Sequence, residues 1–95
     1  MDEKQAQQEK MRARIDEATA EIDRLKARMR RADAEARLAA DEKLKELEAR
    51  RAEASDRLEK LQASGAAAWQ ELRSGAERAG RELGDAIRDA GRHLR

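Results

Sequence analysis

From Asp2 to Ala63 the chain contains neither glycine nor proline, so nothing in this stretch forces a helix to end. Its apolar residues recur at alternating steps of four and three, a spacing that places them on one face of a helix. Alanine, arginine, lysine and glutamate, which all favour helix, fill many of the other positions. The stretch therefore predicts one long coiled-coil-type helix over residues 1–63, about 90 Å in length.

The apolar stripe of this predicted helix passes through two segments, joined by three successive steps of four from Ala32 to Leu44. Such a break unwinds a supercoil locally without interrupting the helix. Because no glycine or proline stands near residues 38–41, we expect a continuous helix there and no hairpin. The large side chains of the stripe are predicted to form an interaction seam that consists of Met11, Ile15, Ile22, Leu25, Met29, Leu44, Leu47, Leu58 and Leu61.

The helical pattern is interrupted at Ser64 and Gly65, where glycine suits a helix end and serine can cap a new helix. We therefore expect a hinge at residues 64–66 and a shorter amphipathic helix over residues 67–95. The apolar face of that helix contains Trp69, Leu72, Leu83, Ile87 and Leu94. The sequence as a whole predicts an all-α protein.

Acid-to-base pairs four residues apart, such as Asp33 with Arg37, line the outer faces of the long helix. Each adds only a few tenths of a kcal/mol to helix stability. Large apolar residues are scarce, because 45% of the 95 residues are charged and one is aromatic. Burying a large apolar side chain contributes about 2 kcal/mol, whereas ordering one residue costs about 1.5 kcal/mol. We therefore expect that a single chain cannot enclose its own apolar surface, and that a homo-oligomer or a partner helix covers the seam.

No combination of residues points to catalysis, a cofactor or a metal. The chain has one histidine, His93, and no cysteine, which excludes a multi-histidine metal site and thiolate chemistry within one chain. Its serines have no base partner at a recognisable spacing. We expect a non-enzymatic structural or interaction protein without a cofactor. The start of the chain lacks an apolar signal core and no apolar run reaches membrane-spanning length, so the cytoplasm is the expected location.

The densest group of positive charges comprises Arg24, Lys26, Arg28, Arg30 and Arg31, with no acid among them. Such a cluster can attract the phosphates of nucleic acids or of an anionic membrane. The net charge is only +1 and a single tryptophan is available for stacking on bases, so we do not expect a nucleic-acid partner. The alternative function is peripheral binding to an anionic membrane surface through the amphipathic helix that holds Trp69.

Two parts of the sequence carry a resemblance to known proteins. Residues 9–17 read EKMRARIDE and residues 20–25 read AEIDRL, and residues 64–75 read SGAAAWQELRSG. Together they resemble a family of short bacterial coiled-coil proteins linked to stress responses, which implies a long helix, a second helix and no enzyme activity. Where such proteins often show a second aromatic residue, this chain has Gly80 after Ala79. The second helix is also similar to the repeats of exchangeable apolipoproteins.

Overall fold

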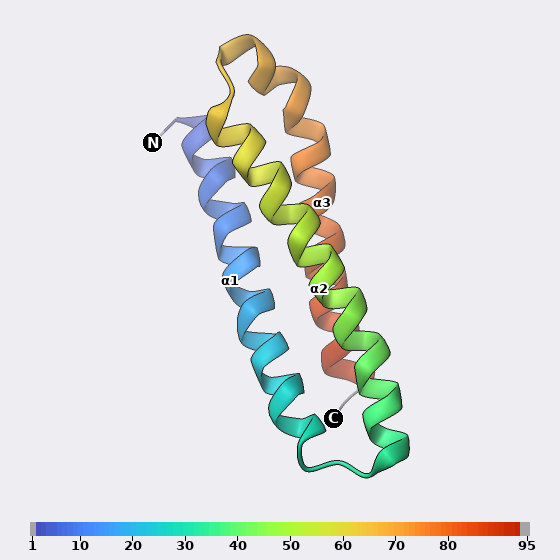
Figure 1. The fold of residues 1–95 in the computed structure, drawn as a ribbon. Helices are drawn as coiled ribbons and strands as arrows, with labels where there is room; N and C mark the ends of the chain where they lie inside the picture. Colours follow the sequence, from blue (N-terminus) through green and yellow to red (C-terminus); the bar gives the residue numbers. More distant parts are fainter. Residues whose placement is uncertain (1, 94–95) are drawn as a thin grey trace.

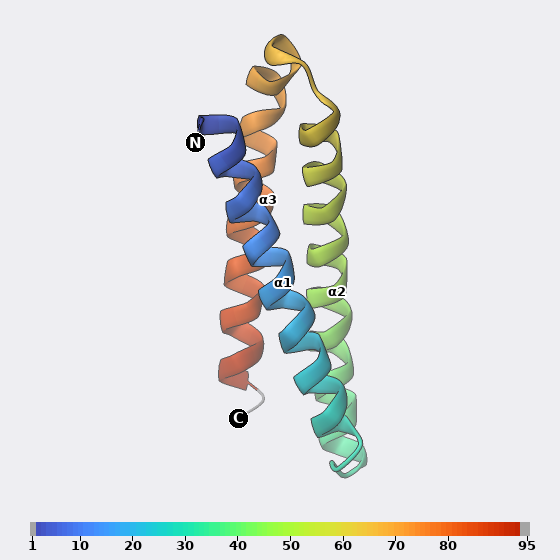
Figure 2. The same cartoon turned by 90° about the vertical axis from the view of Figure 1, so that its left-hand side faces the viewer.

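The computed structural model describes residues 2–93, which form three α-helices that pack side by side. Helix α1 runs over Glu3–Met29, α2 over Ala34–Ala63 and α3 over Ala66–His93. Figures 1 and 2 show α1 and α3 running in one direction and α2 in the other, in an elongated bundle with extents of 51 × 20 × 18 Å. These residues contain no strand, so the all-α prediction is confirmed.

The single helix predicted over residues 1–63 is wrong, because the chain turns between α1 and α2. The N–H of Ala32 donates to the carbonyl oxygen of Met29 at 3.3 Å, which tightens the end of α1 into a 3₁₀-type turn. Asp33 then leaves the helical conformation with a ψ of 176°, and its side chain accepts a hydrogen bond from the N–H of Ala36 at 2.9 Å. Asp33 is thus the N-cap of α2. The predicted 90 Å rod is a helical hairpin.

The turn between α2 and α3 consists of Ser64 and Gly65. Ser64 has an extended backbone, and its hydroxyl donates to the carbonyl oxygen of Leu61 at 2.7 Å. The Nζ of Lys4 donates to the carbonyl oxygen of Ser64 at 2.7 Å, so the start of α1 lies beside this turn, as Figure 1 shows. Helix α3 begins at Ala66 and runs back along α2.

The interior of the bundle combines apolar stripes from all of its helices. Its α3 share consists of Trp69, Leu83 and four alanines, whereas α1 and α2 contribute mainly large side chains. The expectation that one chain cannot enclose its apolar surface is therefore wrong, because it counted only large residues and neglected the alanines that close-packed helices bury. The buried apolar residues are Met11, Ala18, Ile22, Leu25, Ala40, Leu44, Leu47, Ala54, Leu58, Leu61, Trp69, Ala76, Ala79, Leu83, Ala86 and Ala90.

Ion pairs on the surface join α2 to α3. Lys43 Nζ lies 2.7 Å from Asp89 Oδ2, and Arg50 Nη1 lies 2.9 Å from Glu82 Oε2. The hydrogen bond to Asp89 raises the pKa of Lys43. Because all four side chains reach solvent, each pair adds at most about 1 kcal/mol. The apolar interior, and not these pairs, accounts for most of the stability of the bundle.

Candidate functional site

The residues predicted to form the interaction seam lie inside the bundle. Seven of them are buried and two are half-buried, and all pack against other helices of the same chain. In the closed bundle, the interaction seam is thus covered by other helices of the same chain. The buried members are Met11, Ile22, Leu25, Leu44, Leu47, Leu58 and Leu61, and the half-buried members are Ile15 and Met29.

The predicted apolar face of α3 also turns inward. Trp69 is 5% exposed and Leu83 is fully buried, while Leu72 and Ile87 are partly buried against the core; Leu94 lies outside the described residues. The indole Nε1 of Trp69 is buried and has no hydrogen-bond partner within residues 2–93. A buried donor without a partner costs about 1–3 kcal/mol, so the closed bundle holds this side chain at some expense in stability.

The predicted basic cluster lies at the opposite end of the bundle from Trp69, where α1 ends and turns into α2. Arg24 pairs with Glu21 at 2.8 Å and Lys26 with Glu48 at 3.6 Å, so part of its charge is neutralised by neighbours. Beside the turn lies an open hollow of about 470 Å³, with apolar Met29 and Leu44 next to basic side chains. The residues that line it are Lys26, Met29, Arg30, Arg37 and Leu44.

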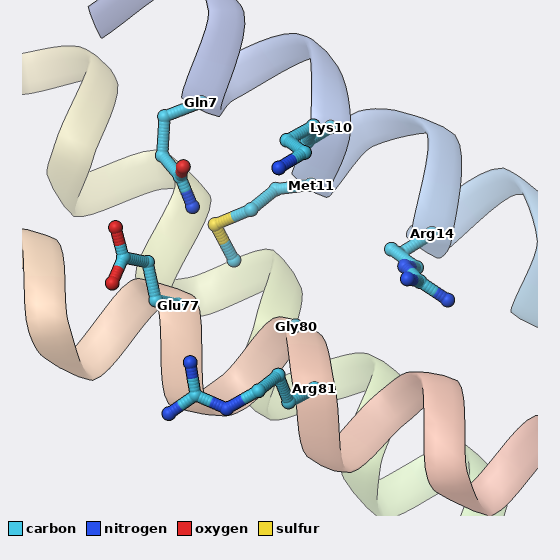
Figure 3. Close-up of a pocket in the computed structure, with 7 residues that line it drawn as sticks. All are labelled: Gln7, Lys10, Met11, Arg14, Glu77, Gly80 and Arg81. Carbon is cyan, nitrogen blue, oxygen red and sulfur yellow. The ribbon is translucent and has the colours of Figure 1, made fainter. Parts of the chain in front are cut away.

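A second hollow, of about 250 Å³, lies between α1 and α3, and we call it the cationic groove. Figure 3 shows Gln7 and Met11 reaching from α1 toward α3, and Glu77 reaching back from α3. The volume would hold about eight water molecules at ~30 Å³ each, or a phosphate-sized group with part of its hydration. The residues that line the groove are Gln7, Lys10, Met11, Arg14, Glu77, Gly80 and Arg81.

The charges around the cationic groove are unbalanced. Three cationic side chains, Lys10, Arg14 and Arg81, line it together with one carboxylate, that of Glu77. Glu77 is already engaged, because its Oε1 accepts from Arg73 Nε at 3.2 Å, and Arg73 pairs in addition with Glu3 at 2.8 Å. The groove therefore carries an excess of positive charge, and its chemistry suits a small anion or an anionic head group.

Glycine at position 84 allows Arg14 to lie close to α3. A Cβ built on Gly84 would stand 2.7 Å from Arg14 Nη1, which is nearer than real Cβ atoms come to another heavy atom. The guanidinium of Arg14 thus lies almost on the backbone of α3. At Gly80, by contrast, a Cβ would meet nothing within 4 Å, because that position opens into the cationic groove.

Sequence reasoning missed the cationic groove. Lys10 and Arg14 are like charges four residues apart on one helix face, which was a visible signal. Arg81 joins them only because α3 runs parallel to α1, and this arrangement depends on the turn that the sequence did not predict.

Neither a metal centre nor a membrane-spanning segment is found in the described part of the chain. Across residues 2–93, no group of three or more His, Asp or Glu side chains is placed so that it could hold a metal ion. In the same range, no helix has both the length and the apolar character needed to cross a bilayer.

The comparisons with known proteins add no assignment to this geometry. Neither the protein-family models, nor the curated proteins, nor the solved structures contain a match to this chain.

Proposed function

We propose that this chain is a non-enzymatic helical interaction protein that self-associates or binds a partner helix, in the setting of a stress response as the sequence resemblance implies. The surface that it offers is the interaction seam, which α3 covers in the closed bundle. Release of α3 would expose the rows of leucine, isoleucine and methionine on α1 and α2 to another helix.

The observation that supports this proposal is the way α3 is held. Only two large side chains of α3, Trp69 and Leu83, are fully inside the core, and its other buried apolar residues are alanines. Four glycines within α3 each lower its helix propensity by about 0.8–1 kcal/mol relative to alanine. Helix α3 therefore depends more on packing against α1 and α2 than on its own helix propensity, and Leu25, Leu47 and Leu61 of those helices are almost completely buried in the closed bundle.

Replacing Leu83 with Asp tests the proposal, because a carboxylate at this buried position expels α3 from the core. If the seam binds helices, the Leu83→Asp chain should become a dimer or larger oligomer while α1 and α2 stay helical. Sedimentation velocity would give the mass and circular dichroism the helix content. The matched control is Ser74→Asp, which adds the same charge to an exposed position of α3 and should leave the mass unchanged. A monomeric Leu83→Asp chain, folded or unfolded, contradicts the proposal.

A second candidate function is binding to an anionic lipid surface, and the buried indole of Trp69 favours it. At a membrane interface a tryptophan places its ring among apolar groups and its N–H toward water, which would satisfy the Nε1 donor that lacks a partner in the closed bundle. The cations of the groove would add about 1 kcal/mol each near a negatively charged surface.

Vesicles with brominated acyl chains test the lipid alternative. Trp69 is the sole tryptophan and is buried already, so a shift of its emission would be small, whereas quenching by bromine reports insertion directly. We expect quenching with phosphatidylserine vesicles, little with phosphatidylcholine vesicles, and weaker quenching when Lys10, Arg14 and Arg81 are all replaced with Gln. Unquenched emission with both lipids would remove this candidate.

A further inference from the structure

We propose that two copies of this chain dimerise by exchanging α1. The turn between α1 and α2 straightens, residues 3–63 become one helix, and the α1 of each copy occupies the place of α1 in the other. The inference rests on the proposal that this chain self-associates and names a second copy as the partner. In this route α3 stays on the core, and α1 is the helix that leaves. The core contacts of the exchanged dimer are those of the closed bundle.

The turn itself requires little change to straighten. Residues 30–33 contain no glycine or proline, and no residue among those described has a positive φ. Arg30 is still in the right-handed helical region, and Asp33 is extended through its ψ of 176° while its φ of −73° is close to a helical value. A rotation of ψ at Asp33, together with changes at Arg31 and Ala32, would carry α1 into α2. The hairpin is held locally by the Asp33 cap and by Arg37 Nε, which donates to the carbonyl oxygen of Met29 at 3.0 Å.

The apolar stripes of α1 and α2 would be in phase along a straight helix. Met29 and Ala40 are eleven positions apart, which at roughly 100° per residue leaves them within about 20° of each other. Ala36, seven positions after Met29, falls within about 20° on the other side. One face of the helix would therefore run from α1 through the former turn into α2 without a break, and could pack on the same face of a second copy.

The closed bundle leaves part of this face uncovered. Figures 1 and 2 show the α1–α2 hairpin extending beyond the end of α3, and the hollow beside Met29 and Leu44 opens there. Ala36 is exposed and Ala32 only half-buried, although both continue the buried stripe. In two antiparallel straightened chains these alanines would face the second copy, as the rest of the stripe does. The new contact is thus continuous with the existing core.

The other turn is less suited to exchange. Gly65 would lie inside a helix if α2 and α3 became continuous, and the Ser64 hydroxyl and carbonyl are both bonded in the present turn. The difference between the turns selects α1 as the exchanged element.

Two single substitutions move the equilibrium in opposite directions. Asp33→Ala removes the cap that holds the hairpin, so the dimerisation constant should rise about thirtyfold for two chains that each lose one cap. Ala34→Pro favours the hairpin, because position 34 is the first residue of α2, where proline is well accepted, and the extended Asp33 before it is compatible with proline. Inside a continuous helix the same proline is strongly unfavourable, so dimerisation should fall more than a thousandfold.

Cysteines at Lys26 and Glu48 show which chain α1 packs on. The two side chains lie 3.6 Å apart across α1 and α2, and the natural chain has no cysteine. In a Lys26→Cys, Glu48→Cys background, a short thiol cross-linker should join residues within one chain for Ala34→Pro and between two chains for Asp33→Ala. Sedimentation of each protein before cross-linking gives its mass.

Each result has a definite meaning. Cross-links between chains in Asp33→Ala, and none in Ala34→Pro, establish the exchange. A dimer of Asp33→Ala that cross-links within each chain overturns the exchange but leaves self-association intact, and a monomer cross-linked within the chain overturns it too. Release of α3 is tested separately by Leu83→Asp, and sedimentation of the unsubstituted chain decides self-association itself. If Asp33→Ala does not fold, the Lys26→Cys, Glu48→Cys chain that keeps Asp33 is cross-linked at high concentration instead. Cross-links within each chain only, as expected for Ala34→Pro, then refute the exchange.

Discussion

A chain in which Asp replaces both Ile22 and Leu25 is expected to lose all of its helices together. These side chains are 3% and 0% exposed in the shared core, and a buried carboxylate without a partner costs several kcal/mol. Small domains are stable by only about 5–15 kcal/mol, so two such charges exceed what the bundle can tolerate. Isolated helices with few tertiary contacts are marginal in water, and α2 and α3 should melt with α1. Circular dichroism at 222 nm would record the loss.

The control for this variant carries Asp at Ala13 and Ala20, two exposed positions of the same helix. It has the same added charge and a similar cost in helix propensity, yet it should keep most of its helix content and a cooperative thermal transition. If the Ile22→Asp, Leu25→Asp chain remained as helical as this control, the helices would not depend on their common core, and the fold described above would be wrong in solution.

Replacing Trp69 with Ala should lower the free energy of unfolding by about 3–5 kcal/mol, the usual cost of removing a large aromatic side chain from a core. The ring is 5% exposed, and the guanidinium of Arg73 lies 5.4 Å from its centroid, so a cation–π contact is lost as well. Urea unfolding followed by circular dichroism gives the value, since the only fluorophore is removed.

Trp69→Phe separates the two properties of this side chain. Phenylalanine keeps much of the apolar ring but removes the Nε1 donor that has no partner. We therefore expect Trp69→Phe to cost far less than Trp69→Ala, because relief of the unsatisfied donor offsets part of the lost volume. A Phe variant as unstable as the Ala variant would show that the indole N–H is bonded in solution, for example to water.

The helical state of the chain and its apolar stripes could be predicted from the sequence, whereas the first turn could not. The apolar stripe residues, from Met11 to Leu61, line the interior, and Ser64 and Gly65 lie between α2 and α3. The spacing of four predicts that Asp33 pairs with Arg37, an interaction worth a few tenths of a kcal/mol. In the structure Asp33 caps α2, an interaction worth about 1 kcal/mol, and Arg37 Nε donates to the carbonyl oxygen of Met29 at 3.0 Å. The helix cap is thus the larger of the two local interactions of Asp33, and it favours the turn over a continuous helix.

The cationic groove could not be predicted for a different reason. Lys10 and Arg81 are distant in sequence, and their approach depends on two turns that bring α3 back parallel to α1. In the single helix that the apolar pattern predicts over residues 1–63, Lys10 would not lie near Arg81. Because the turn at residues 30–33 was not predicted, the cationic groove could not be predicted either.

The contact between Arg14 and Gly84 has an evolutionary consequence. Since a Cβ at position 84 would stand 2.7 Å from Arg14 Nη1, a side chain there would displace the guanidinium of Arg14, which is the end of a flexible, exposed side chain and can turn aside. In related sequences position 84 should therefore accept alanine beside arginine at 14, with the loss of this close contact between the first and third helices.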